Sequence, residues 1–340
     1  MMPESFNSNY EPAFFSRDVS PPLSDISQSL LEFIISRLPD SSHPLGKPAH
    51  HHFKKAGKQL RGRMALTAAD CFGVPQSLSM RWAAAVEILH NASLVHDDIC
   101  DGDMVRRGMP SVWAQYGKDT ALALGDWLIA LSFELASEAA CIGQTPKLVS
   151  VLSHHMATTT TGQASEFAIN SYPSWSKYMD ISTGKTAPLF VAAVEGVAYL
   201  AERNDIIKPL QRFFTAAGGC YQIANDMLNV IGKDGAASPA SDLLRRAPNA
   251  VIVMFRTTLD REHAAEFDSW LASGSEHNAL NWQTRLRRSP ALSMTASALM
   301  SMFDEAESSS DALPSDCQAI ITPIKAQLRH VCRDLVADNS

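Results

Sequence analysis

Apolar residues recur every three or four positions through most of this chain, a spacing that predicts amphipathic helices. The first such segment, residues 24–38 (SDISQSLLEFIISRL), opens with Ser and Asp as capping residues and continues with helically spaced Leu and Ile. Comparable segments occupy residues 76–98, 119–140, 179–202 and 209–232. Alternation of polar and apolar residues, which is typical of a half-buried strand, is rare, and we therefore predict no strands.

The predicted helices are apolar on more than one side, so each must pack against several neighbours or a second subunit. Their alanine and glycine residues, such as residues 83–85, Gly218 and Gly219, allow helix backbones to approach closely. We therefore predict an all-α protein in which residues 25–340 form a single domain of ten or more helices. Residues 1–24 carry Pro, Ser and Asn without periodicity, which predicts a disordered tail.

The composition excludes several classes of protein. Of 340 residues, 46% are hydrophobic and 19% are charged, as in a soluble protein with a large core. No run approaches the roughly 20 apolar residues of a transmembrane segment, and the N-terminus lacks the features of a secretory signal. The six cysteines show no paired spacing, which predicts reduced thiols in a cytoplasmic protein.

The net charge of −7 makes nucleic acid an unsuitable partner. The basic residues instead gather locally, in residues 53–63 and in the pair Arg106 and Arg107. Small basic clusters in an acidic protein suit a small anionic ligand better than a polyanion.

Residues 94–108 (LVHDDICDGDMVRRG) combine an apolar run, a group of aspartates and two arginines. Asp97 and Asp101 are four residues apart, so on a helix they share a face. Acids at a helix C-terminus oppose the helix dipole and add little stability, although a solvated acidic helix end is the alternative interpretation. Clustered carboxylates suit Mg²⁺, and Arg106 and Arg107 suit phosphate oxygens. We therefore predict a metal–phosphate site.

A second polar patch lies in residues 221–235 (YQIANDMLNVIGKDG). On a helix, Asn225, Asn229 and Lys233 share one face, and Gln222, Asp226 and Asn229 share an adjoining one. Taken alone, a helix with a polar stripe explains this pattern equally well.

Together these segments resemble the trans-isoprenyl diphosphate synthases of the polyprenyl synthetase family. Residues 88–108 resemble its first aspartate-rich motif, Asp-Asp-x-x-Asp followed by Arg-Arg-Gly. Residues 57–63 (GKQLRGR) resemble its Gly-Lys-x-x-Arg-Pro motif, with Gly62 where proline is usual. Further similar motifs follow in the family's order: GDWL at Gly125, TGQASEF around Gln163, GKTAPLF around Lys185, and residues 221–232 at the second aspartate-rich position.

The resemblance covers roughly residues 45–250 and implies an isoprenoid synthase fold with a deep central cavity, usually in a homodimer. It also implies a reaction with two small-molecule substrates. An allylic diphosphate ionises with the help of two or three Mg²⁺ ions, isopentenyl diphosphate attacks the allylic cation, and loss of a proton leaves a longer trans-prenyl diphosphate.

Motif position implies a role for each matching residue. Carboxylate and amide oxygens of the two acidic motifs would bind Mg²⁺: Asp97, Asp98, Asp101, Asn225, Asp226 and Asn229. Asp98 has a supporting part among them. The residues expected to hold the allylic diphosphate are Arg106, Lys185, Thr186, Gln222 and Lys233. The residues expected to hold isopentenyl diphosphate are Lys58, Arg61, His90 and Arg107. Catalysis would depend most on Asp97, Asp101, Lys185 and Asp226.

In this family, bulky side chains one to three turns before the first aspartates limit product length. Ala92 and Ser93 are small, whereas Leu89 and Trp82 continue the same stripe, and Trp82 is a candidate floor for the cavity. Ordinary core packing explains the same residues. We expect the product to be geranylgeranyl diphosphate, with twenty carbons, or a longer prenyl diphosphate.

The second motif departs from the family pattern, because Asn225 and Asn229 stand where aspartates are usual. A lysine that usually precedes Ser241 is also missing, unless Lys233 replaces it. Three functions remain open: a working prenyl diphosphate synthase, a class I terpene cyclase, and a non-catalytic regulatory subunit of a heteromeric synthase. The residues matched to isopentenyl diphosphate argue against a cyclase, and the complete first motif argues against a non-catalytic subunit.

Overall fold

The computed structural model describes residues 22–55, 57–167, 172–233, 240–273 and 278–337, and this part of the chain is almost entirely helical. The all-α prediction is therefore confirmed. The predicted tail lies outside the described residues except for residues 22–24, which already belong to the first helix.

The elements follow one another in this order: α1 (Pro22–Arg37), α2 (Gly46–Phe53), α3 (Leu60–Cys71), α4 (Gln76–Asp101), β1 (Val105–Arg106), β2 (Met109–Pro110), α5 (Val112–Tyr116), α6 (Lys118–Ile142), α7 (Lys147–Phe167), α8 (Trp175–Leu200), η2 (Asn204–Ile206), α9 (Ile207–Ile231), α10 (Ser241–Arg245), α11 (Ala250–Thr258), α12 (Arg261–Ser273), α13 (Ala279–Arg288), α14 (Ala291–Asp311), η3 (Ser315–Cys317) and α15 (Gln318–Ala337).

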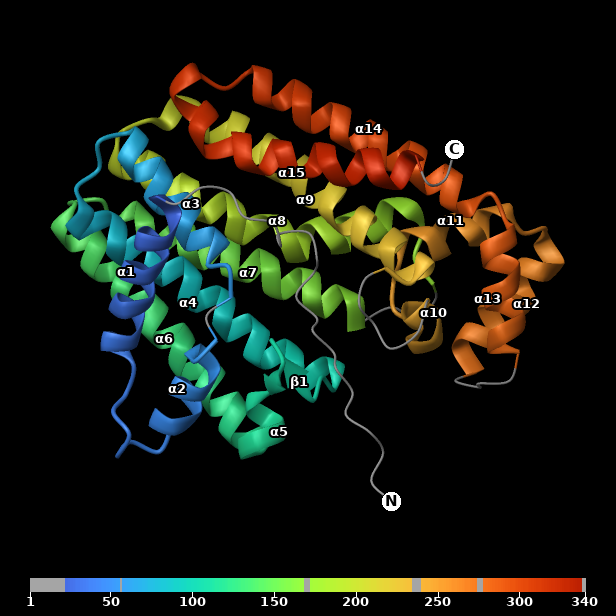
Figure 1. Cartoon of the computed structure of the whole chain (residues 1–340), viewed down its shortest axis with the longest axis horizontal. Coiled ribbons are helices and arrows are strands. Elements are labelled where there is room, and N and C mark those ends of the chain that lie inside the picture. Colours follow the sequence, from blue (N-terminus) through green and yellow to red (C-terminus); the bar gives the residue numbers. More distant parts are fainter. Residues whose placement is uncertain (1–21, 56, 168–171, 234–239, 274–277, 338–340) are drawn as a thin grey trace.

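Five long helices form the centre of the molecule (Figure 1). Helix α4 packs along α6, α7 packs along α8, and α9 lies between α8 and α14. Helices α14 and α15 run together along one edge, and α10 to α13 form one end of the bundle (Figure 1). The C-terminal end of α4 leads directly into the β1–β2 ribbon, so the predicted acidic motif lies at an end of the bundle.

Small residues let α4 and α8 pack closely, as their alanine content suggested. Ala83, Ala84 and Ala85 are fully buried on α4. Trp82 lies against Gly196 of α8 and donates its indole N–H to the carbonyl oxygen of Ala193 at 3.1 Å. The buried indole thus has a hydrogen-bond partner, as a Trp in a core requires.

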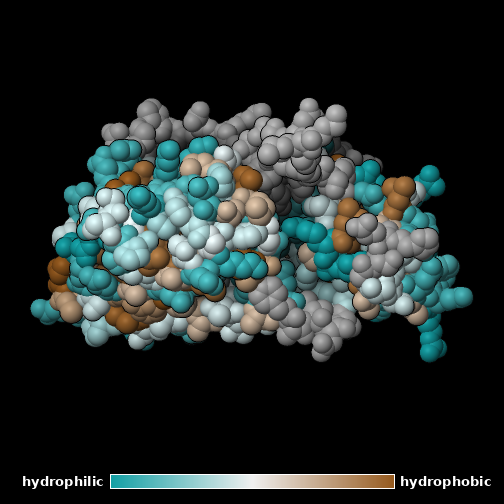
Figure 2. Space-filling view, turned by 90° about the horizontal axis from the view of Figure 1, so that it is seen from below, coloured by the Kyte–Doolittle hydropathy of each residue, from teal (hydrophilic) through white to brown (hydrophobic). Residues whose placement is uncertain are grey.

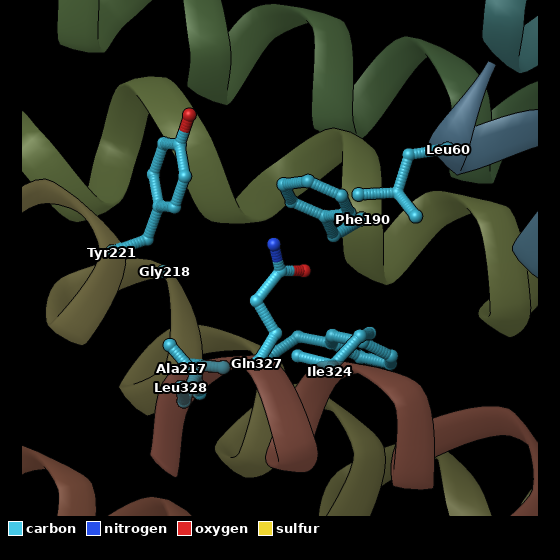
Figure 3. Close-up of a pocket in the computed structure, with 9 residues that line it drawn as sticks. Leu60, Phe190, Ala217, Gly218, Tyr221, Ile324, Gln327 and Leu328 are labelled. Atoms are coloured by element: carbon cyan, nitrogen blue, oxygen red, sulfur yellow. The ribbon is translucent and has the colours of Figure 1, made fainter. Parts of the chain in front are cut away.

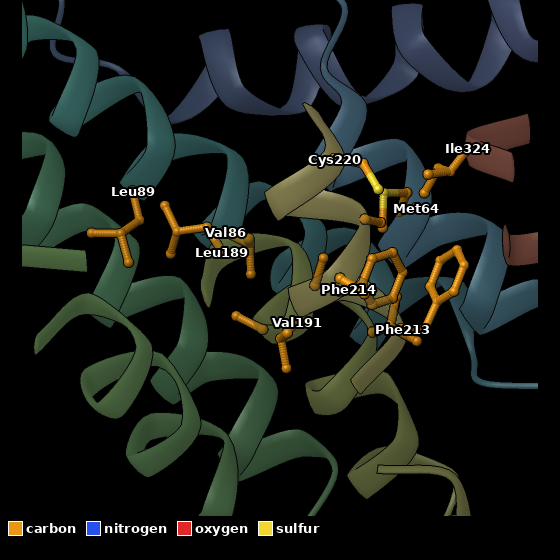
Figure 4. Close-up of a cluster of buried hydrophobic side chains, with 14 of the residues drawn as sticks. Met64, Val86, Leu89, Leu189, Val191, Phe213, Phe214, Cys220 and Ile324 are labelled. Atoms are coloured by element: carbon orange, nitrogen blue, oxygen red, sulfur yellow. The ribbon is translucent and has the colours of Figure 1, made fainter. Parts of the chain in front are cut away.

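One hydrophobic core connects α3, α4, α8, α9 and α15. Figure 4 shows side chains from these helices directed toward one another, with Phe214 of α9 between Met64 of α3 and Val191 of α8 and the Phe213 ring beside it. Apolar area removed from water contributes roughly 25 cal/mol per Å². This shared core keeps the helices that carry the candidate site residues in a fixed arrangement.

Among the described helices, only α6 is long and apolar enough to cross a membrane, with a mean hydropathy of 1.3 in its most apolar window. It packs along α4, and 44% of that window is buried within the protein. A core helix of a bundle passes the same test, so α6 is weak evidence for a membrane span.

The β1–β2 ribbon was not predicted from the sequence, because each strand has only two residues. Gly102 ends α4 in the left-handed conformation (φ 72°). Arg106 then pairs with Met109, and the two residues between them, Arg107 and Gly108, both have positive φ (54° and 68°). Two consecutive positive φ values are typical of the tight hairpin turn of type I′. The turn orients the two arginines of the motif.

The contact between Gly196 and Trp82 yields a test of this packing. A Cβ atom at position 196 would lie 2.0 Å from Cε2 of Trp82, so Gly196→Ala forces a buried ring to move. We expect the substitution to lower the free energy of unfolding by about 1–3 kcal/mol, measured by urea denaturation.

Gly184→Ala on the same helix is the matched control. A Cβ atom there meets its nearest neighbour at 3.6 Å, an ordinary contact, so the gain in helix propensity should leave stability unchanged or raised by up to about 1 kcal/mol. Equal stability of the two variants would contradict the close packing of α4 on α8.

Candidate active site

The two adjacent aspartates of the first motif face different surroundings. Asp97 is partly exposed in the last turn of α4, whereas Asp98 is 1% exposed. Arg106 of β1 donates its Nε–H to Oδ1 of Asp98 at 2.8 Å and binds the same oxygen through Nη2. Asp103 lies 3.5 Å from that guanidinium. Asp98 therefore positions Arg106 through Oδ1, while its buried Oδ2 has no hydrogen-bond partner. Its predicted supporting part in metal binding stays a prediction.

Asp97 and Asp101 are influenced by a lysine from another helix. Burial raises the pKa of Asp97 to about 6, Lys185 of α8 opposes the rise, and Asp101 adds to it. The pKa of Asp101 is also raised, first by burial and then by the charge of Glu166, while the charge of Lys185 opposes the rise. Lys185 forms an ion pair with Glu166 of α7. Helices α4, α7 and α8 thus bring two carboxylates, a lysine and its partner into one region.

The surface of the molecule is hollowed on one side (Figure 2). Figure 2 shows hydrophilic side chains within a recess between the larger body and the smaller end formed by α10 to α13. Lys185 of α8 and Arg245 of α10 both act on Asp101 at the C-terminal end of α4, so these three elements border one region, which we call the mouth of the site.

The donors in the mouth fit Mg²⁺. No group of three or more His, Cys, Asp or Glu residues suited to a metal ion occurs in the described part of the chain. A metal here would have only two carboxylates, Asp97 and Asp101, as well-placed protein ligands. Mg²⁺ is commonly held by one or two carboxylates plus water and substrate phosphate. Burial raises the pKa values of both carboxylates even though Lys185 opposes the rise, so a bound cation would stabilise their charged forms further.

The residues predicted to hold isopentenyl diphosphate come together from three segments. Burial lowers the pKa of His90 well below its usual value, and the charges of Arg61 and Arg107 lower it further. His90 is therefore neutral. Arg107 donates from Nη1 to the carbonyl oxygen of Lys55 at 2.9 Å, and its guanidinium lies so close to Gly57 that a Cβ there would be 2.5 Å from Nη2. Lys58 follows Gly57 directly.

Arg61 is held by an aromatic ring. Its guanidinium carbon lies 4.2 Å from the centre of the Phe190 ring, in a cation–π contact, and burial lowers the pKa of Arg61 to about 10 while Glu87 opposes the change. Phe190 also lines an apolar pocket between α3, α8, α9 and α15, where Figure 3 shows the Gln327 amide directed toward the space between Phe190 and Tyr221. This pocket is separate from the predicted chain-length stripe on α4.

The structure explains the unusual glycine of the GKQLRGR segment. The backbone N–H of Gly62 donates to Oε2 of Glu87 on α4 at 3.0 Å, and Glu87 is 3% exposed. A Cβ at position 62 would lie 2.4 Å from Leu30 of α1. Proline, which has no N–H and carries a ring, satisfies neither requirement.

The second motif is engaged in structural hydrogen bonds. Asp226 is 3% exposed; its Oδ2 accepts hydrogen bonds of 2.6 Å from Tyr178 and from the N–H of Ala250, and its Oδ1 accepts one of 2.9 Å from Gln222. Burial raises the pKa of Asp226 to about 8, and the charge of Asp242 adds to the rise. The predicted pairing of Gln222 and Asp226 on one helical face is confirmed.

Asn229 is also turned inward, at 1% exposure. Its Nδ2 donates to Oγ of Ser241 at 2.7 Å, and its Oδ1 accepts from the N–H of Asp242 at 3.2 Å. This geometry does not favour the prediction that Asp226 and Asn229 bind metal, because neighbouring protein groups already occupy their side chains. Asn225 alone of the three remains partly exposed.

The other predicted residues are distributed more widely. Thr186 is partly buried beside Lys185, and Lys233 is exposed just after Gly232, which ends α9. The chain-length stripe runs down α4, with Ala92, Leu89 and Trp82 buried and Ser93 partly buried. Trp82 lies 15 residues before Asp97, or about 22 Å along a helix.

Sequence reasoning did not single out three residues that organise this region. Glu166 pairs with Lys185, and the signal for it was its place three residues after Gln163 in a family-like motif. Tyr178 holds Asp226. Asn249 caps α11 by accepting from the N–H of Val251 at 2.9 Å, and donates to the Asp226 carbonyl oxygen at 3.2 Å. Neither residue carries a sequence signal beyond its identity.

Comparison with known proteins agrees with this arrangement. A sequence profile described as Polyprenyl synthetase matches residues 42–283. The chain is 33% identical over 218 residues to a geranylgeranyl diphosphate synthase of Saccharolobus solfataricus, covering 62% of this chain and 65% of that protein. It is 30% identical over 247 residues to the enzyme of the same name from Sulfolobus acidocaldarius, covering 70% and 74%. The first alignment thus spans just under two thirds of the relative.

The fold extends the similarity to nearly the whole chain. The crystal structure of a decaprenyl diphosphate synthase from Rhodobacter capsulatus superimposes with a TM-score of 0.81 at 22% identity, covering 92% of this chain and 97% of that one. At this identity the likeness concerns the fold alone.

The role of Gly62 predicts that proline, the residue usual at this position in the family, destabilises this protein. We expect Gly62→Pro to lower the free energy of unfolding by about 1–3 kcal/mol, because the buried Glu87 carboxylate loses its backbone donor. Urea denaturation followed by circular dichroism measures the change.

Gly62→Ala keeps the N–H and separates the two effects. Its Cβ makes one close contact, with Cδ2 of the buried Leu30 at 2.4 Å, and this contact is common to both variants. Because only Gly62→Pro also removes the N–H, Gly62→Ala should lose less stability. If both variants lose the same amount, the hydrogen bond to Glu87 is not the reason for the glycine.

Proposed function

The chain belongs to the polyprenyl synthetase family, and from this premise we propose that it is a Mg²⁺-dependent trans-prenyltransferase. It condenses isopentenyl diphosphate with an allylic diphosphate and releases a longer allylic diphosphate, pyrophosphate and a proton. The observation that carries the proposal is the meeting of Asp97 and Asp101 with Lys185, beside an Arg106 that is fixed by Asp98.

Ionisation of an allylic diphosphate breaks a carbon–oxygen bond, and the diphosphate departs with the electron pair. Asp97 and Asp101 would hold Mg²⁺, which would supply positive charge toward that leaving group. Lys185 exchanges its partner Glu166 for phosphate oxygens, and Arg106, already oriented by Asp98, donates hydrogen bonds from the side. Because these groups are placed before the reaction, little reorganisation is needed as charge develops.

The second substrate requires its own set of cations. Arg61 and Arg107 flank the neutral His90, with Lys58 next to the glycine that contacts Arg107. This set suits a second diphosphate, held close to the first because Arg106 and Arg107 are consecutive. Neutral His90 serves as a hydrogen-bond donor or acceptor without adding charge. A terpene cyclase has no use for this second set.

Product length, assembly and location follow from weaker features. The small side chains of Ala92 and Ser93 leave room for a product of twenty carbons or longer. The presence of a geranylfarnesyl diphosphate synthase of Aeropyrum pernix among the relatives also supports a long product. We also propose a homodimer, to which the exposed apolar side chains of α6, Leu122 and Ile142 (48% and 52% exposed), contribute contact area. The cysteines that the structure describes are free thiols, which supports a cytoplasmic location.

The proposed activity is tested with purified protein, Mg²⁺, labelled isopentenyl diphosphate and allylic diphosphates of increasing length. We expect label to enter a longer prenyl diphosphate, and chelation of Mg²⁺ to abolish the reaction. A hydrocarbon or alcohol made from the allylic substrate alone would indicate a terpene cyclase, which Asn225 and Asp226 favour. Turnover only after addition of a second protein would indicate a regulatory subunit.

Product length is tested at Ser93, which lies one turn before Asp97 on the same face of α4 and is partly buried. We expect Ser93→Phe to shorten the main product by at least one isoprene unit, measured by chromatography of the dephosphorylated products. Leu94→Phe, about 100° away around the helix, is the control and should leave product length unchanged. Equal product profiles for wild type and Ser93→Phe would show that the stripe does not line the cavity.

A further inference from the structure

A chain of buried hydrogen bonds connects the segments that carry the residues predicted to hold isopentenyl diphosphate. It begins at His52 in the last turn of α2, continues through Asn91 and Glu87 of α4, and ends at the backbone N–H of Gly62 in α3. His52, Asn91 and Glu87 are at most 8% exposed. These polar groups are buried away from water and therefore depend on one another for hydrogen bonds.

Asn91 is the centre of this chain. Its Nδ2 donates to the backbone oxygen of Glu87 at 2.8 Å and to Oε1 of the same residue at 3.4 Å. Because both neighbours are acceptors, the orientation of the amide is fixed, and Oδ1 accepts from Nε2 of His52 at 3.0 Å. Burial, with a smaller effect of the Arg107 charge, lowers the pKa of His52 to about 3, so the ring is neutral. Asn91 therefore holds His52 as the tautomer with its proton on Nε2.

Two members of the chain lie directly beside predicted substrate residues. Asn91 follows His90 on α4, and Gly62 follows Arg61 on α3. The N–H of Gly62 donates to Oε2 of Glu87 at 3.0 Å, one turn before Asn91. These hydrogen bonds therefore fix the backbone of α3 against α4 at the positions from which Arg61 and His90 extend.

His52 acts on the segment that meets Arg107. The carbonyl oxygen of Lys55, three residues after His52, accepts from Nη1 of Arg107 at 2.9 Å. The same guanidinium lies against the backbone of Gly57, and Lys58 is the next residue. Through His52, helix α4 thus holds the end of α2, from which the segment with Lys55 and Lys58 continues.

The chain ties α2 and α3 to a single turn of α4, between Glu87 and Asn91. Donors from separate segments bind a diphosphate well only if they converge beforehand, because ordering them on binding costs affinity. We propose that His52 and Asn91 are positioning residues for isopentenyl diphosphate, which align the segments that carry its predicted binding residues. The proposal rests on the proposed function and names two residues that neither predicted diphosphate set contains.

The test compares two substitutions of His52 in the full chain by steady-state kinetics, with each substrate varied in turn. His52→Phe keeps an aromatic ring but removes the N–H donor, whereas the amide of His52→Gln restores an N–H near the position of Nε2. Loss of one hydrogen bond predicts that His52→Phe raises KM for isopentenyl diphosphate about 3- to 10-fold and leaves KM for the allylic diphosphate within about twofold. His52→Gln should return KM for isopentenyl diphosphate toward the wild-type value.

His155→Phe is the matched control. His155 of α7 is also buried, and its Nε2 lies 2.7 Å from Oε2 of Glu195 on α8. The same substitution there removes a buried hydrogen bond between two helices that carry none of the predicted isopentenyl diphosphate residues. It should lower Tm while leaving KM for isopentenyl diphosphate unchanged.

An unchanged KM for isopentenyl diphosphate in His52→Phe would overturn the inference and leave the proposed function intact. Equal rises of both KM values, the same rise in His155→Phe, or no recovery in His52→Gln would also overturn it, in favour of a general structural role. Should His52→Phe not fold, His52→Asn replaces it in the comparison with His52→Gln, because its shorter amide does not reach Asn91. A wild-type protein that consumes no isopentenyl diphosphate with any allylic diphosphate would overturn both proposals.

Discussion

The burial of the Asp97 carboxylate beside Asp101 is the constraint to which the surrounding structure responds. Both carboxylates lie in the last turn of α4, where the helix dipole and each other's charge disfavour them. Burial is the largest penalty and raises the pKa of Asp97 to about 6, and the charge of Asp101 adds to the rise. Lys185 from α8 lowers this penalty without removing it, so an added cation is strongly favoured at this position. The core shared by α4, α8 and α9 keeps these groups together at some expense of stability.

The sequence predicts the helices well, because their apolar periodicity reflects burial that the fold then provides. It also predicts that Asp97 shares a face with Asp101 and Gln222 with Asp226, since both pairs are four residues apart on one helix. It does not distinguish Asp97 from Asp98: consecutive helical residues point about 100° apart, and only the position of Arg106 shows which of them faces inward.

Periodicity along the sequence does not predict which distant segments come into contact. Tyr178 and Asp226 are 48 residues apart, and their hydrogen bond depends on the packing of α8 against α9. The same holds for the two departures from the family pattern. Gly62 is understood only with Glu87 and Leu30 beside it, and Asn229 only with α10 attached to it. In both places a residue that looks degenerate in the sequence makes a specific hydrogen bond in the fold.

The β1–β2 ribbon has a mechanical consequence for the two substrates. Arg106 is bound to Asp98 on α4, while Arg107, the next residue, is bound to the backbone of Lys55. Their Cα atoms are joined by one peptide unit, about 3.8 Å long, inside a turn with no spare residues. The two arginines therefore cannot shift independently. On the proposed function, a diphosphate that displaces the ribbon at one site also displaces the arginine at the other site. The turn therefore couples the two diphosphate sites mechanically.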